Sequence, residues 1–115
     1  MLKPEVLRGK KDFSLIYNRG KSLGDRFVVL FYRKNGLSYN RIAFLASKKV
    51  GKSVRRNRAR RLMKESFRQI REEVLTGYDL VIIARNTING ADFLKVKQSL
   101  VHALQRGRLW KGEKQ

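Results

Sequence analysis

The stretch from Tyr78 to Ala84 constrains the possible folds of this chain more than any other segment. It is a nearly continuous run of β-branched and other apolar side chains, which is typical of a strand in the middle of a sheet. A central strand requires partner strands on both sides and other elements that cover its faces. The chain has 115 residues, so we expect a single domain spanning residues 1–115.

Two segments that precede this run also have strand character. Phe27 to Arg33 is β-branched and aromatic, and Arg41 to Ser47 is mostly apolar. The Asn35-Gly36 dipeptide marks a turn between them, so we expect the two strands to run in opposite directions. The turn-rich stretch before Phe27 has space for one more short strand near Leu23.

Helical periodicity occurs near both ends of the chain. In the segment from Lys10 to Gly20, Phe13, Ile16 and Tyr17 lie on one face at the i, i+3, i+4 spacing. Asp92 is expected to begin the last helix, because apolar residues recur after it on one stripe. That stripe consists of Phe93, Val96, Leu100, Ala103 and Leu104.

The segment from Lys48 to Arg71 has an unusual charge. It contains 11 Lys and Arg residues in 24 positions and a single acidic residue, Glu65. We expect a helix from about Val54 to Leu75, with Ser53 as its N-cap and Gly77 beyond its end. At about 100° per residue, polar and apolar side chains fall on opposite arcs of this helix. The polar arc contains Asn57, Arg60, Arg61, Lys64, Arg68 and Arg71, and the apolar arc contains Ala59, Leu62, Met63, Phe67, Ile70 and Val74.

Together these elements predict an α+β fold. The expected order is helix, three strands, long helix, strand and helix, or αβββαβα, arranged as a compact sandwich in which helices cover a small mixed sheet. The ends of the chain, at about 1–8 and 108–115, are expected to form flexible tails.

The charge balance indicates a polyanionic partner. The chain contains 28 Lys and Arg against 9 Asp and Glu, and the resulting net charge of +19 opposes a compact state unless a polyanion offsets it. Solvated helix faces usually mix both signs of charge, which this helix does not. Nucleic acid is favoured, because bound Lys and Arg release counterions from phosphates. An anionic membrane is the alternative, but no apolar run approaches the roughly 20 residues of a spanning helix, so we expect no membrane partner.

Few residue types are available for catalysis. Cysteine is absent, which removes disulfides, thiolate metal sites and thiol nucleophiles and agrees with a cytoplasmic protein. His102 is the only histidine and lies beside Leu100, Val101 and Leu104, so we expect it to be packed or on the surface. The acidic residues are scattered along the chain rather than clustered for metal-assisted hydrolysis. We therefore expect no catalytic residue and no metal site in the chain itself.

The basic segment and its surroundings resemble the RNR-motif family of bacterial ribonuclease P proteins. Arg56-Asn57-Arg58 follows the run from Ala46 to Gly51 and precedes Arg61-Leu62, and the strand from Tyr78 to Arg85 comes in the family's order and spacing. The resemblance covers roughly Lys10 to Leu104. It implies a left-handed crossover through the long helix, although the usual hand of such crossovers is right.

The resemblance also implies a function. In this family a catalytic RNA hydrolyses the 5′ leader from precursor tRNA with Mg²⁺ that is held mainly by the RNA. The expected partners are therefore the ribonuclease P RNA and the leader of precursor tRNA, and no protein partner is indicated.

Two groups of site residues follow from the resemblance by position. The RNA-binding motif surface would contain Lys48, Lys49, Lys52, Arg55, Arg56, Asn57, Arg58, Arg60, Arg61, Lys64 and Arg68. The leader-binding cleft, between the first helix and the sheet, would contain Phe13, Tyr17 and Phe31. Judged from the residues, these three rings suit core packing as well as leader binding, so both interpretations stay open.

Three other functional classes are considered as alternatives. A small ribosomal or RNA-chaperone protein would have the same composition, and the identity of the co-purified RNA would distinguish it. A DNA-binding helix module would need a helix-turn-helix pair or a dimer spacing, and neither is evident. A stand-alone nuclease would need clustered carboxylates or a base–acid pair.

Overall fold

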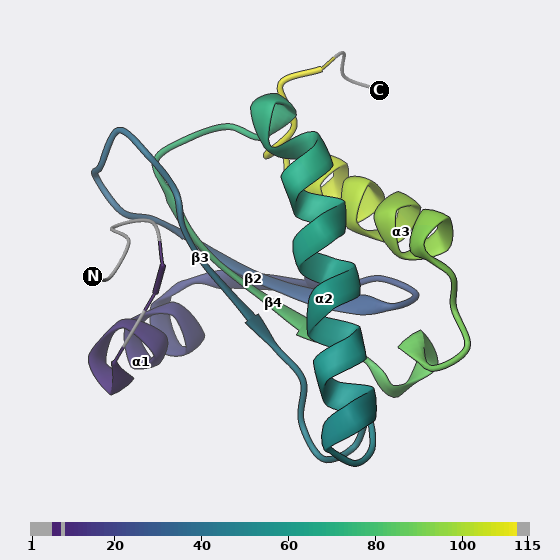
Figure 1. The fold of residues 1–115 in the computed structure, drawn as a ribbon. Coiled ribbons are helices and arrows are strands. Elements are labelled where there is room, and N and C mark those ends of the chain that lie inside the picture. The colour runs from purple at the N-terminus through teal and green to yellow at the C-terminus, as the bar shows by residue number, and fades with distance from the viewer. Residues whose placement is uncertain (1–5, 8, 113–115) are drawn as a thin grey trace.

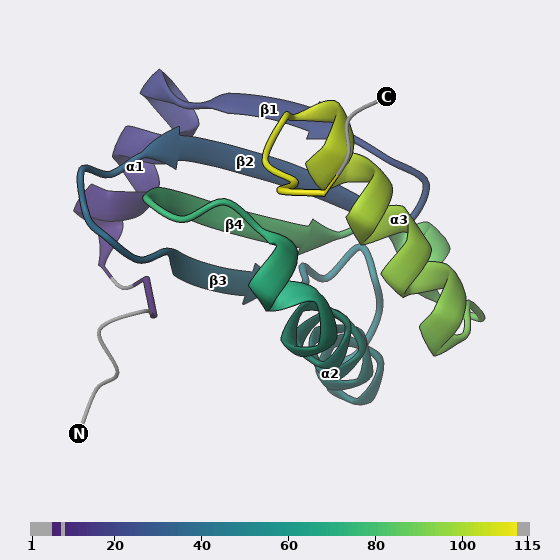
Figure 2. The same ribbon diagram turned by 90° about the horizontal axis from the view of Figure 1, so that it is seen from above.

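The predicted order of elements, αβββαβα, is confirmed. The computed structural model describes residues 6, 7 and 9–112. The elements are α1 (Lys10–Arg19), β1 (Lys21–Gly24), β2 (Val28–Lys34), β3 (Arg41–Leu45), α2 (Ser53–Ile70), β4 (Tyr78–Ala84) and α3 (Phe93–Arg106), with 3-10 turns η1 (Arg71–Glu73) and η2 (Asn86–Ile88). Helices α2 and α3 cover one face of the sheet and α1 lies against the other, as Figures 1 and 2 show.

The sheet has four strands in the order β1-β2-β4-β3. Strand β4 is central as predicted, because it pairs antiparallel with β2 and parallel with β3. Strands β2 and β3 run in opposite directions as expected, but β4 separates them, so the turn at Asn35-Gly36 does not join paired strands. The apolar run of β4 explains this arrangement, because only the middle position buries it on both edges and both faces.

The parallel strands β3 and β4 are joined through α2. When β3 and β4 point away from the viewer, the chain passes from β3 over α2 to β4 in a counter-clockwise sense, which can be followed in Figures 1 and 2. The crossover is therefore left-handed, as the resemblance implied.

The two faces of the sheet have cores of different size. Leu80 and Ile82 of β4 join the large core formed with α2 and α3. Val81, which points to the opposite face, joins a small core with Leu7, Ile16 and Ala43 under α1. The alternation along β4 thus connects two separate hydrophobic layers.

The apolar arc of α2 is confirmed, but its cap and its end are not. Ala59, Met63, Phe67, Ile70 and Val74 are buried, and Leu62 packs against them while partly exposed. The helix begins one residue earlier than expected, with Lys52 rather than Ser53 at the N-cap position and no side-chain cap. The Ser53 hydroxyl instead accepts a hydrogen bond from Arg56 Nη2 at 3.3 Å. The α-helix ends at Ile70 and continues as η1, because Val74 turns into the core in an extended conformation.

The start of α3 agrees with the prediction, since Asp92 caps it by accepting a hydrogen bond from the Lys95 amide at 2.9 Å. The expected tail from residue 108 is wrong for residues 109–111. Leu109 is fully buried and its carbonyl accepts a hydrogen bond from Leu75 N, while Lys111 N donates to Glu73 O. Leu109 is drawn in because its side chain completes the large core.

The expected N-terminal tail is likewise corrected at residues 6 and 7. Leu7 is buried in the small core, and its amide donates to the Ile42 carbonyl at 3.1 Å. The remaining parts of both predicted tails, at residues 1–5, 8 and 113–115, lie outside the described residues. Within residues 6, 7 and 9–112, no helix has the length and apolar character needed to cross a membrane.

Candidate nucleic-acid interface

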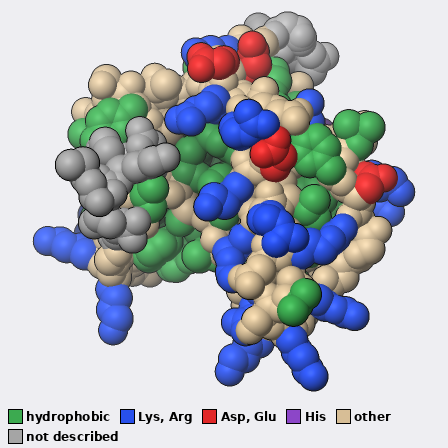
Figure 3. Space-filling view, in the orientation of Figure 1, with side chains coloured by type: hydrophobic (Ala, Val, Ile, Leu, Met, Phe, Trp, Pro, Cys, Tyr) green, Lys and Arg blue, Asp and Glu red, His purple; other side chains and the backbone are tan. Residues whose placement is uncertain are grey.

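Helix α2 presents a basic surface because its apolar stripe packs into the core. With Met63 and Phe67 against the sheet, the opposite arc must face outward. Asn57, Arg61, Lys64 and Arg68 are exposed and Arg60 is half-buried. Figure 3 shows Lys and Arg side chains gathered over α2 and around its lower end. We call this surface, from Lys48 in the connector before α2 to Arg68, the basic rail.

The structure places the predicted motif residues together on this rail. Lys48, Lys49 and Lys52 are exposed on the connector between β3 and α2, and Arg55 is exposed on the first turn of the helix. The next turn is less open, because Arg56 and Arg58 are half-buried. The cations at the start of α2 therefore differ in how open they are to a ligand.

Arg58 has a structural contact that the sequence did not reveal. Its Nη2 donates a hydrogen bond of 2.8 Å to the Ala91 carbonyl, which joins α2 to the loop before α3. Arg56 bonds only Ser53, and its Nε is buried with no partner among the described residues. Part of the motif thus positions the helix, while other donors of these two guanidinium groups remain available.

The outward charges on the rail are mostly uncompensated. Glu65 pairs with Arg68, whose hydrogen bond holds the pKa of Glu65 below its ordinary value. Such an exposed pair contributes little to stability. Arg60 bonds its neighbour Asn57, and within the described part of the chain neither Arg60 nor Lys64 has an acidic partner. The middle of the rail therefore keeps a strong positive charge.

A groove lies between α2 and the edge strand β3. Its volume is about 1280 Å³, and its apolar wall includes Ile42, Phe44 and Leu62. Arg60 and Lys64 line the side that belongs to the rail. In Figure 3 the groove is visible as a hollow in which hydrophobic side chains lie beside Lys and Arg. This groove combines an apolar floor with a basic rim.

The three predicted cleft aromatics form a cluster where α1 meets the sheet. The ring centroids of Phe13 and Tyr17 lie 6.2 Å apart, and those of Tyr17 and Phe31 lie 4.9 Å apart. Phe13 and Phe31 are half-buried against the small core, whereas Tyr17 is 43% exposed. Partial burial raises the pKa of Tyr17, so its ring is neutral at physiological pH. The cluster therefore packs on one side and presents ring surface on the other.

Phe13 connects the aromatic cluster to the rail. It lines the groove beside α2 and also a shallower hollow along α1, which Ser14 and Tyr17 line as well. A single extended chain can therefore contact the aromatic rings and the basic rim together. The structure brings the two predicted groups of site residues to one continuous surface.

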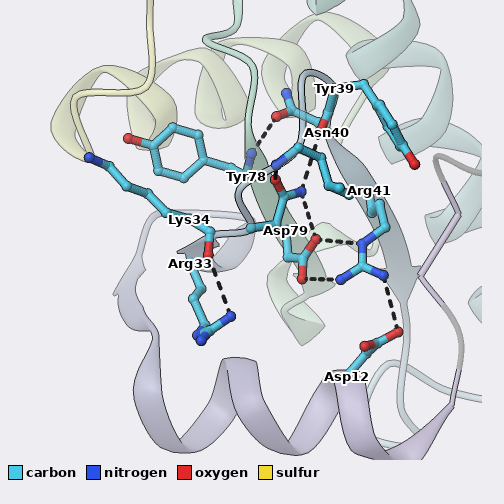
Figure 4. A network of polar contacts seen from close by, with 10 residues as sticks. Asp12, Arg33, Lys34, Tyr39, Asn40, Arg41, Tyr78 and Asp79 are labelled. Atoms are coloured by element: carbon cyan, nitrogen blue, oxygen red, sulfur yellow. Dashed lines mark hydrogen bonds and ion pairs between the residues drawn. The ribbon is translucent and has the colours of Figure 1, made fainter.

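The sequence did not reveal the ion pairs of Arg41, one of which joins α1 to the sheet. Asp79 on β4 is buried and accepts hydrogen bonds from Arg41 Nε at 2.8 Å and Nη2 at 2.7 Å, and a third from Asn35 at 3.0 Å. Arg41 Nη1 lies 3.6 Å from Asp12 of α1. Figure 4 shows Arg41 between the two carboxylates. The available signal was a single acid, Asp79, inside an otherwise apolar strand.

His102 is exposed and pairs with Asp25, with 2.6 Å between Nδ1 and Oδ2. The hydroxyl of buried Ser99 donates to the other oxygen of Asp25 at 2.7 Å. Burial opposes ionisation of Asp25, but the hydrogen bonds from Arg26 N, Ser99 and His102 outweigh it, so the pKa of Asp25 lies below its ordinary value. Because Ser99 bonds the carboxylate and not the imidazole, His102 cannot activate it as a nucleophile. Across residues 6, 7 and 9–112, no three His, Asp or Glu side chains are grouped to hold a metal.

A basic helix beside a half-open aromatic cluster, carried on an α+β sandwich, defines a nucleic-acid-binding domain. The chain belongs to the ribonuclease P protein family, because the family model described as Ribonuclease P matches residues 1–108. This match confirms the resemblance seen in the sequence. It also confirms the role that the resemblance implied, that of a protein subunit in tRNA processing.

Similar proteins cover nearly the whole chain. A ribonuclease P protein component of Thermoanaerobacter sp. (strain X514) is 41% identical over 113 residues, which is 96% of this chain and 97% of the relative. One from Clostridium botulinum (strain Langeland / NCTC 10281 / Type F) is 43% identical over 110 residues, or 95% and 99%. The solved RNase P protein of Thermotoga maritima superimposes with a TM-score of 0.81 at 37% identity, covering 89% of this chain and 96% of that one. That of Staphylococcus aureus gives 0.84 at 28% identity, covering 94% and 99%.

Proposed function

We propose that this protein binds the ribonuclease P RNA through the basic rail and the 5′ leader of precursor tRNA through the aromatic cluster. The observation that carries this proposal is the position of Phe13, which lines both the groove beside α2 and the hollow along α1. A site with basic and aromatic surfaces in contact suits a single strand leaving a folded RNA.

The rail is suited to phosphates rather than to base edges. Arg and Lys contacts to phosphates supply most of the sequence-independent affinity for RNA, and they release counterions when they form. Lys48, Lys49, Lys52 and Arg55 form the open end of the rail, and Arg60, Arg61 and Lys64 form its middle. Arg56, Asn57 and Arg58 contribute the donors that their internal bonds leave free, and Arg68 contributes despite its pair with Glu65.

The aromatic cluster is suited to unpaired bases. Stacking on an aromatic ring needs an exposed ring face and depends little on the identity of the base. Tyr17 supplies such a face. Phe13 and Phe31 hold the Tyr17 ring from two sides. Only precursor tRNA has a 5′ leader, so this contact would favour the precursor over the mature product.

We assign the cleavage step to the RNA subunit, with Mg²⁺ held mainly by that RNA. The described protein residues contribute positive charge and stacking surface, and several of their carboxylates are engaged in ion pairs, among them Arg41–Asp79 and Arg68–Glu65. The protein's electrostatic task is to offset repulsion between two polyanions, which otherwise requires many cations. We place this activity in the cytoplasm.

The salt dependence of RNA binding tests the rail. We expect Arg60→Ala and Lys64→Ala each to lower the slope of log affinity against log salt by about 0.7 for a single-stranded contact and about 0.9 for a duplex contact. Lys34→Ala is the matched control, because Lys34 is exposed at the end of β2 away from the start of α2. An unchanged slope in folded Arg60 and Lys64 variants would remove the rail from the interface.

A further inference from the structure

One end of the sheet gathers basic segments that are distant in sequence. Val28 pairs with Ala84, and Leu45 pairs with Ile83, so β2 begins where β4 and β3 end. The β1–β2 turn therefore lies at the same end as the residues that follow β4 and β3. In Figure 2 the arrowheads of β1, β4 and β3 point to this common side.

Two arginines from other elements converge on the β1–β2 turn. Arg106 of α3 donates from Nη1 to the Gly24 carbonyl at 2.7 Å, and Arg85, which follows β4, donates from Nη1 to the Asp25 carbonyl at 3.0 Å. These contacts use one nitrogen of each guanidinium and fix its position. The remaining N–H donors stay available, and both side chains are exposed.

A third arginine in the turn has no such bracing role. The guanidinium of Arg26 lies 5.1 Å from the centroid of the Phe27 ring, and it makes no hydrogen bond within the described part of the chain. The one carboxylate nearby, Asp25, is only 9% exposed and is bonded to Ser99, His102 and Arg106, whose Nη1 lies 3.4 Å away, and not to the guanidinium group of Arg26 or Arg85. The outer surface of the turn is therefore positively charged.

This surface is physically joined to the start of the basic rail. Within the segment after β4, Thr87 Oγ1 donates to the Arg26 carbonyl at 2.5 Å, and Asn89 Nδ2 donates to the Val50 carbonyl at 2.6 Å. The segment thus contacts the β1–β2 turn on one side and the connector of the rail on the other. The basic side chains along this sheet end, from the β1–β2 turn to the connector, therefore form a row. Because neighbouring strands lie about 4.8 Å apart, this row is roughly 14 Å long.

We propose that this row of basic residues, led by Arg26 and Arg85, is a second contact surface for phosphates of the ribonuclease P RNA. The inference rests on the proposed function, because the row continues the connector at Lys48 and Lys49 and so meets the same RNA as the rail. Bracing the turn requires neither the guanidinium of Arg26 nor the unused donors of Arg85. Anchored arginines bind phosphate with little loss of side-chain freedom.

The test compares Arg26→Gln and Arg85→Gln with Lys34→Gln, which removes the same charge at the opposite end of the sheet. The measurement is the affinity for a bacterial ribonuclease P RNA over a range of salt concentrations, with thermal unfolding as the folding control. We expect each arginine variant to lower the salt slope by about 0.7 to 0.9, and the lysine variant to leave it unchanged. Arg26→Gln should do so with little loss of stability, because the contact of its guanidinium with the Phe27 ring is at an exposed site.

The other outcomes contradict the inference in distinguishable ways. If the arginine variants bind the RNA like Lys34→Gln while Arg60→Ala lowers the slope, the second surface is absent and the proposed function stands. If Arg60→Ala also has no effect, the proposed function itself fails. If the arginine variants weaken only the binding of precursor tRNA to the assembled ribonucleoprotein, the row contacts the substrate and the assignment to the RNA subunit is wrong.

Discussion

The two faces of the sheet are covered to very different degrees. Under α2 and α3, side chains such as Leu30, Met63 and Ile82 are completely buried. Under α1 the fully buried set is small, and the neighbouring ring of Tyr17 is 43% exposed. The first face stabilises the domain, whereas the second leaves aromatic surface available for a ligand. Apolar residues at regular spacing can therefore serve either purpose, and the cover supplied by other elements decides between them.

Truncation of a core residue on each face should show this difference most strongly. Met63→Ala should lower the free energy of unfolding by about 2–5 kcal/mol, because it leaves a cavity in a closed core. Phe13→Ala should cost clearly less, since its ring is half-buried and borders open grooves. Urea unfolding with unchanged m-values measures both effects. Equal losses would mean that α1 closes its face as completely as α2 does.

For ligand binding, unlike stability, substitutions on the face under α1 should have the larger effect. In the assembled ribonucleoprotein, Tyr17→Ala should weaken binding of precursor tRNA by about 1–3 kcal/mol through lost stacking, and should leave mature tRNA unaffected. Tyr17→Phe should retain most of the affinity. Tyr39→Ala is the matched control, because Tyr39 is similarly exposed but lies in the loop between β2 and β3. If precursor and mature tRNA weaken together, the aromatic cluster is not a leader site.

The smallest expected effect concerns the ion pair that joins α1 to the sheet. Asp12→Asn should lower stability by about 0.2–1 kcal/mol, because the Asp12–Arg41 pair is half-exposed and Arg41 keeps its bonds to Asp79. Arg41→Gln should cost far more, since it leaves the buried carboxylate of Asp79 without its cation. Thermal unfolding compares the two variants. Similar losses would show that the buried carboxylate of Asp79 does not depend on Arg41 as its cation.

The sequence predicted those parts of the fold that depend on local patterns. The order of elements, the central strand at Tyr78–Ala84 and the apolar stripe of α2 follow from periodicity and are confirmed. The order of the strands in the sheet was not predictable in this way. Strand β4 comes last of the four in the sequence, after α2, yet it lies between β2 and β3. Only the resemblance to a known family indicated the left-handed crossover, which contradicts the general rule.

The details that sequence reasoning missed depend on tertiary contacts. Leu109 looked like part of a flexible end, but it fills the core beneath Val74 and Leu75. Arg58 looked like one more surface cation, but it bonds the Ala91 carbonyl. Both assignments require knowing which distant backbone lies nearby, and composition does not contain that information.

The central claim is that the RNA subunit carries out cleavage and the protein only assists it. Cleavage of precursor tRNA as a function of Mg²⁺ concentration tests this claim most directly. The three arms are nuclease-free protein alone, ribonuclease P RNA alone, and both together. We predict no cleavage by the protein at any Mg²⁺ concentration, slow cleavage by the RNA when Mg²⁺ is low, and efficient cleavage at low Mg²⁺ when both are present, because a protein of charge +19 offsets phosphate repulsion. Robust cleavage by the protein alone, abolished by His102→Ala, would contradict the account.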